Sequence, residues 1–220
     1  MSHLHLPDGM VPLWLWAPAL GAVLLLLLLS NRNALPQAVA YQGALGGLML
    51  AAMSVPLGPL EYHLTLAGPV GVLLGAAGAF PVVFVASVIL ACLGHGGLTS
   101  VGLNALMLGS AAAVARGAFV TLEGKLGPAW AMALASAAGQ VAAAVLWAGV
   151  AVVTLGISFG HVPLAKGGVR IELLAGLTLV VWIVGTLIES VVAFGIGRFL
   201  SRVYPGLLPR GLDPRAGEAA

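Results

Sequence analysis

The chain has 220 residues, of which 60% are hydrophobic and only 7% are charged, with a net charge of +2. Ordinary soluble domains have about 45–50% apolar and about 25% charged residues, so this composition excludes them and indicates an all-α integral membrane protein. The small positive charge gives no basis for nucleic-acid binding. We predict one transmembrane substrate-binding domain at residues 1–210 and a short cytoplasmic tail at 211–220.

The stretch MSHLHLPDGMVP at the start of the sequence contains two histidines and a turn signal. No Lys or Arg precedes the apolar run that follows, so the charged start of a cleaved signal peptide is missing. We therefore expect His3 and His5 to remain in the mature protein. Pro7 fixes its own backbone angle and Gly9 tolerates a left-handed bend, so this turn can fold the preceding residues back over the bundle.

Apolar segments then follow along the rest of the chain. They lie at 13–29, 36–57, 64–78, 80–94, 102–122, 128–155 and 171–201. The third and fourth are shorter than the roughly 20 residues that a helical span needs, and the GAAGAFP stretch near their junction is compatible with a tight turn or a kink. We predict a polytopic bundle of about seven transmembrane segments in the cell membrane.

Basic residues indicate the orientation, because short loops rich in Lys and Arg stay on the cytoplasmic side. With seven segments and the N-terminus outside, most basic residues lie inside, namely Arg32, Arg116, Lys125, Arg198, Arg202, Arg210 and Arg215. Only Lys166 and Arg170 then lie outside. We therefore predict an external N-terminus and a cytoplasmic C-terminus.

In this orientation every histidine lies on the external side, as His3, His5, His63, His95 and His161. A single histidine near a membrane interface more often caps a helix or reaches towards solvent than binds a metal. Imidazole is nevertheless the usual nitrogen ligand of first-row transition metals, and His3, His5, His63 and His95 together favour a shared metal site.

The first three residues offer further nitrogen ligands. An amine on Met1, or on Ser2 if Met1 is removed, can bind a metal together with a backbone amide and the imidazole of His3. Several nitrogens then lie in one plane, which suits Ni(II) or Cu(II). This short motif is weak by itself.

Other chemistries find little support in the sequence. It contains no GxxxxGK[ST], HExxH or GxSxG motif, so we predict neither ATP hydrolysis nor an enzyme, and no cofactor. Two alternatives stay open: a metal-dependent membrane enzyme, for which Glu61 is the only acid near His63, and a partner-independent channel or carrier, which would need polar residues along a full path. We interpret Glu189, inside the last segment, as an interhelical hydrogen-bonding group.

Three stretches, HLPDGMVP, GHGGLTSVGLNALMLG and IESVVAFGIGRFL, together resemble the CbiM/NikM family over residues 4–208. These are the substrate-binding membrane components of energy-coupling factor transporters for cobalt and nickel. The resemblance implies a metal held near the outer face by the N-terminal amine, a backbone amide, a histidine near the N-terminus and a loop histidine that matches His63. His95 and Asn104 match the glycine-rich segment that supports the site, and Asp8 matches the turn after the first histidine.

The sequence departs from this family where the N-terminal histidine lies. That histidine usually follows the initiating methionine directly, whereas here it aligns with His5 and MSHL precedes it. Loss of Met1 would leave Ser2 followed by His3 and would restore an amine next to a histidine. We name both histidines and rank His3 above His5 for the amine chelate.

The resemblance also implies a function and partners. The chain would capture Co(II) or Ni(II) as a transported substrate and would act in the lipid bilayer with a transmembrane coupling subunit and ATP-binding subunits. A small accessory membrane component is a further implied partner. The ligand types do not separate cobalt from nickel, because both ions accept nitrogen ligands.

Overall fold

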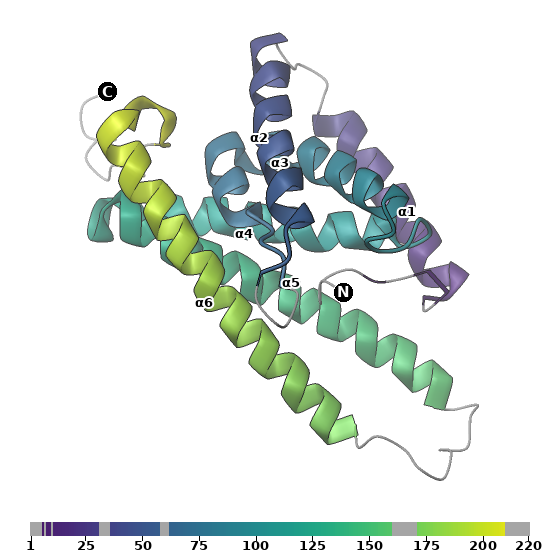
Figure 1. Cartoon of the computed structure of the whole chain (residues 1–220). Helices are drawn as coiled ribbons and strands as arrows, with labels where there is room; N and C mark the ends of the chain where they lie inside the picture. Colours follow the sequence, from purple (N-terminus) through teal and green to yellow (C-terminus); the bar gives the residue numbers. More distant parts are fainter. Residues whose placement is uncertain are drawn as a thin grey trace, which may run out of the picture.

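The computed structural model describes residues 6, 8–9, 11–30, 36–57, 62–159 and 171–209, and it is helical throughout its regular elements. The elements are α1 (Leu13–Ser30), α2 (Pro36–Ser54), α3 (Ala67–Cys92), α4 (Val101–Leu126), α5 (Pro128–Phe159), α6 (Ile171–Val203) and a short 3₁₀ helix at Pro205–Leu207 (Figure 1). Five of them, α1, α3, α4, α5 and α6, are long and apolar enough to cross a membrane. The prediction of an all-helical, multi-pass membrane protein is therefore confirmed.

The number of segments differs from the prediction because the third and fourth predicted segments form one element, α3. Within the described ranges there are six α-helices where seven segments were expected. The break between the two halves of α3 lies at Gly75, whose φ of 75° and ψ of 167° are not helical. This backbone conformation is readily accessible to glycine. The break thus falls within the GAAGAFP stretch, where a tight turn or a kink was predicted, and Pro81 lies inside the second half of the helix.

The break at Gly75 makes α3 fold back on itself. A straight helix of this length, 26 residues, would separate its ends by about 39 Å at about 1.5 Å per residue. His63, just before α3, and His95, just after it, nevertheless have ring centroids only 5.5 Å apart. The two halves of α3 therefore run in opposite directions, and both ends of the element lie at the same end of the bundle.

A basic side chain satisfies part of the backbone at this break. Arg116 of α4 donates from Nη1 to the carbonyl oxygen of Val72 at 2.5 Å. This carbonyl belongs to the last turn of the first half of α3, where carbonyls lack helical partners and a positive charge is favourable. The arginine thus stabilises an interrupted helix inside the bundle.

Small residues let α3, α4 and α5 pack closely. A Cβ added to Gly68 would lie 2.6 Å from Oγ of Ser136 on α5, and a Cβ added to Gly71 would overlap the backbone of Ala112 on α4. Such close approach is typical of membrane helices, whose association depends on packing because lipid tails are as apolar as the side chains. These three helices form the rigid centre against which the connecting segments are placed.

Candidate metal-binding site

The reversal of α3 brings two predicted site residues together, His63 and His95. His63 lies in the extended segment between α2 and α3, and its side chain is 5% exposed. His95 lies in the turn between α3 and α4 and is exposed. Their rings meet edge to face, with centroids 5.5 Å apart and an interplanar angle of 77°. Two imidazoles that are distant in sequence therefore share one location.

The N-terminal segment is anchored beside this pair through the backbone of Leu6. The Leu6 amide donates to Oδ1 of Asn104 at 2.9 Å, and Asn104 donates from Nδ2 to the Leu6 carbonyl at 3.4 Å. The same carbonyl accepts from the Gly97 amide at 3.0 Å and from the Ser100 hydroxyl. The Leu6 side chain is buried, so both its backbone and its side chain hold the segment in place.

Asp8 makes a second attachment to the same turn. Its carboxylate accepts from the Leu98 amide at 3.0 Å, from the Thr99 amide at 2.8 Å and from the Thr99 hydroxyl at 2.6 Å. These hydrogen bonds, those from Thr99 first, hold the pKa of Asp8 below its ordinary value. A Cβ added to Gly97 would overlap the backbone nitrogen and Oδ1 of Asp8, so this close approach requires glycine. We call these contacts of Leu6 and Asp8 with Gly97–Ser100 and Asn104 the N-terminal clamp.

The N-terminal clamp fixes where the preceding residues begin. Gly97, which binds Leu6, follows His95 by two positions, and the His95 ring contacts His63. His5 directly precedes Leu6, and His3 lies three residues upstream, which is at most about 11 Å of extended chain. The positions of Met1, Ser2, His3, His5, Glu61 and His161 lie outside the described residues. The structure therefore brings together Asp8, His63, His95 and Asn104 among the predicted site residues.

The segment that carries His63 rests on polar groups of α5 and α6. Thr65 donates to Oε1 of Glu189 from its amide and, at 2.8 Å, from its hydroxyl, and that hydroxyl accepts from Nε2 of Gln140 at 3.0 Å. Burial, and then the negative charge of Glu189, raise the pKa of the Tyr62 hydroxyl above its ordinary range. Glu189 therefore binds a connecting segment, whereas we expected it to bind a neighbouring helix.

Sequence reasoning missed the roles of Tyr62, Thr65 and Gln140. The signal that could have found them is the carboxyl group within an apolar helix, because such a group requires hydrogen-bond donors from elsewhere in the protein. The sequence alone does not say which of the many possible donors it meets.

The described residues alone cannot complete a metal site. Within those ranges no group of three or more His, Cys, Asp and Glu side chains could hold a metal ion. His63 and His95 offer imidazole nitrogens, while the Asp8 carboxylate is engaged by its three donors. The segment with His3 and His5, which precedes the clamp in the sequence, lies outside the described residues.

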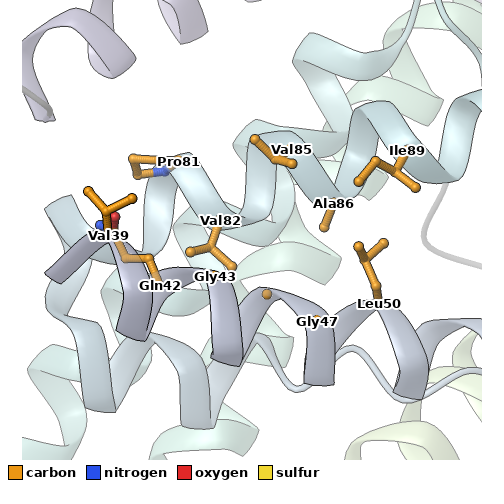
Figure 2. Close-up of a pocket in the computed structure, with 11 residues that line it drawn as sticks. Val39, Gln42, Gly43, Gly47, Leu50, Pro81, Val82, Val85, Ala86 and Ile89 are labelled. Carbon is orange, nitrogen blue, oxygen red and sulfur yellow. The ribbon is translucent and has the colours of Figure 1, made fainter. Parts of the chain in front are cut away.

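An apolar pocket elsewhere in the bundle has no metal-binding character. It lies between α2 and the second half of α3 and has a volume of about 650 Å³ (Figure 2). Gln42 lies at one end, where its Nε2 donates to the carbonyl of Gly78 at 2.9 Å. The rest of the lining is apolar side chains and glycine, so this pocket has no ionisable ligands.

Comparisons with known proteins agree with this architecture. The family model described as the cobalt uptake substrate-specific transmembrane region, CbiM, matches residues 5–207. A crystal structure of a transition metal transporter superposes with a TM-score of 0.74 at 21% identity, covering 90% of this chain and 93% of that chain. A structure of a truncated transition metal transporter gives a TM-score of 0.73 at 21% identity, covering 90% and 98%.

At this identity the two structures show a shared fold. Among curated proteins none matches the chain significantly. The family model, by contrast, spans nearly the whole chain, including the clamp, the His63 segment and α6. The chain therefore belongs to the CbiM family. It is a substrate-specific transmembrane component of cobalt uptake, and not an enzyme.

Proposed function

We propose that the protein captures Co(II) or Ni(II) at a nitrogen-rich site formed by its N-terminal residues and His63. The observation that carries this proposal is the N-terminal clamp, in which Asn104 binds the backbone of Leu6 on both its amide and its carbonyl. His3 and His5 closely precede Leu6 in the sequence, and the turn that binds Leu6 also carries His95, whose ring contacts His63. This proximity supports a site that combines the N-terminal nitrogens with His63.

The proposed ligands are nitrogens from both sides of the clamp. They are the amine of Met1, or of Ser2 after loss of Met1, a backbone amide, the imidazole of His3 or His5, and the imidazole of His63. Such a set is compatible with Co(II) and with Ni(II), and a planar arrangement would favour Ni(II). His95, Asn104 and Asp8 support the site by holding His63 and the clamp.

The chain would work as one subunit of a larger transporter. We propose that residues 1–210 form the substrate-binding domain, with the N-terminus outside, residues 211–220 as a cytoplasmic tail, and the metal site on the outer face. The sequence has no phosphate-binding loop. Energy would therefore come from ATP-binding subunits through a transmembrane coupling subunit, with a small accessory membrane component as a further partner.

The variant His63→Ala tests the site. Loss of an outer-sphere residue commonly costs about 10–100-fold in metal affinity, so loss of a direct ligand should cost at least that much. Calorimetric titration of the purified protein with Ni(II) and with Co(II) gives the measurement. Thr121→Ala is the control, because Thr121 is exposed on α4 and its hydroxyl donates to the Ala118 carbonyl of its own helix, so this variant should bind like the parent. Parent-like binding by His63→Ala would remove His63 from the ligand set.

A further inference from the structure

Glu189 occupies an unusual place for a carboxyl group, because its side chain is completely buried within the apolar helix α6. A carboxyl group in such surroundings is costly unless hydrogen-bond donors compensate for the water that it has lost. The donors that Glu189 meets come from the segment that carries His63. The position of Glu189 therefore helps to fix the position of that segment.

The contacts of α6 lie on both sides of His63 in the sequence. Before it, the Tyr62 ring packs against Gly185 of α6, where an added Cβ would overlap it. After it, Thr65 donates to Oε1 from its amide and its hydroxyl. One turn of α6 thus contacts the residue before the histidine and the residue two positions after it.

The segment needs such support because it is not helical. Tyr62 pairs with Leu57 through two backbone hydrogen bonds of 2.7 and 3.1 Å, and no other ladder continues from that pair in the described residues. At the other end, Leu66 has a φ of 52°, an uncommon conformation for a residue other than glycine. The buried amides between these points require acceptors, and Glu189 supplies one.

We propose that Glu189 is the positioning residue of His63: it accepts two hydrogen bonds from Thr65, two positions after the histidine, and so sets the place of the imidazole in the metal site. This inference rests on the proposed function, in which His63 is a metal ligand. Glu189 itself is not among the proposed ligands. Its side chain acts through Thr65, and Gln140 of α5 secures the Thr65 hydroxyl from the other side.

Two substitutions of Glu189 test whether its side chain acts as a hydrogen-bond acceptor or only fills space. Glu189→Gln keeps an oxygen acceptor and should retain an affinity for Ni(II) close to that of the parent. Glu189→Leu keeps the volume but removes the acceptor, and its affinity should fall by about 10–100-fold, as for other residues that orient metal ligands. The Ni(II) absorption band should also shift in Glu189→Leu and not in Glu189→Gln, because the band reports ligand geometry.

The full-length purified protein is used for every variant, with the thermal unfolding midpoint measured alongside. Ser190→Ala is the matched control, since Ser190 follows Glu189 on α6 and bonds only within its own helix, to the Thr186 carbonyl, among the bonds the structure gives it. It should bind Ni(II) like the parent. If Glu189→Leu does not fold, Thr65→Val decides the question, because it removes the hydroxyl donor and should weaken binding and shift the band.

His63→Ala, measured in parallel, keeps the two proposals apart. If it binds like the parent, His63 is not a ligand and the proposed site fails. If it loses binding while Glu189→Leu and Thr65→Val bind like the parent with an unshifted band, the positioning role of Glu189 is overturned and the proposed site stands. Equal losses in Glu189→Gln and Glu189→Leu would also overturn the role of Glu189 as an acceptor.

Discussion

Asn104 binds Leu6 across 98 positions of sequence, with Oδ1 accepting from the Leu6 amide at 2.9 Å and Nδ2 donating to the Leu6 carbonyl at 3.4 Å. The buried side-chain amide of Asn104 thereby binds both the N–H and the C=O of Leu6, in the way that a residue of a neighbouring β-strand would. The backbone of Leu6 is thus attached to the first turn of α4.

Replacing Asn104 should release this segment without unfolding the bundle. In Asn104→Ala, we expect a loss of about 10–100-fold in Ni(II) affinity, comparable to that of other residues that orient ligands. Hydrogen exchange followed by mass spectrometry should show faster exchange of the peptide that contains Leu6, because its amide loses its acceptor. Parent-like protection of that peptide would contradict the clamp.

Adding a single methyl group at Gly97 should have a similar effect by a different route. The new Cβ in Gly97→Ala would overlap Asp8, so the clamp must shift, at a cost of about 1–3 kcal/mol for overpacking. The expected result is weaker metal binding. Gly124→Ala on α4 is the control, because nothing lies within 4 Å of its added Cβ and it should leave binding unchanged.

Metal binding should weaken as the pH falls, and the clamp should not be the cause. The pKa of Asp8 in the folded protein lies below its ordinary value. Its ionised form therefore stabilises the fold fully above the ordinary pKa, and this stabilisation is lost only as the pH falls through the lowered pKa. The ordinary pKa of a histidine side chain is about 6.5, and an imidazole must be neutral to bind a metal. The affinity for Ni(II) should therefore decline through that range, with the same midpoint in Asp8→Asn. A midpoint that moves in Asp8→Asn would argue against this assignment.

Blocking the amine should weaken binding if the amine is a ligand. A tag placed before Met1 should lower the affinity for Ni(II) much more than the same tag after Ala220, because the proposed chelate needs an uncharged terminal nitrogen. Titration of the two tagged proteins under the same conditions makes the comparison. Equal affinities would leave the imidazoles of His3 or His5 with His63 as the ligands.

Transport should depend on other subunits. Cells that produce only this chain should show no sustained energy-dependent Co(II) uptake, because the sequence contains no nucleotide-binding motif. Addition of the coupling and ATP-binding subunits should restore it. Robust uptake by the chain alone, measured with radioactive cobalt, would favour the partner-independent carrier instead.

The long apolar helices could be predicted closely from the sequence. The segments at 13–29 and 171–201 correspond to α1 (Leu13–Ser30) and α6 (Ile171–Val203) within about two residues, because a sustained apolar run in a membrane protein has few alternatives to a helix. The sequence also signalled the break in α3 through its glycine-rich stretch. It left a tight turn and a kink both open, because the choice between them depends on the backbone angles of Gly75.

The contacts that build the candidate site were far less accessible. Thr65 and Glu189 are 124 positions apart, and nothing in the local pattern of either segment pairs them. Asn104 and Asp8 entered through a family resemblance and not through spacing or periodicity. Hydropathy locates spans along the chain, whereas the choice of neighbours among helices depends on packing details such as the fit of Tyr62 against Gly185.

The N-terminal clamp also constrains biosynthesis. Leu6 is translated 98 residues before its partner Asn104, which at about 5–20 residues per second is a delay of about 5–20 s. During this interval the histidine-bearing segment must wait while α1, α2 and the folded-back α3 enter the bilayer. One of the first parts of the chain to leave the ribosome is thus among the last to reach its final place, because the clamp cannot form before α4 has been made.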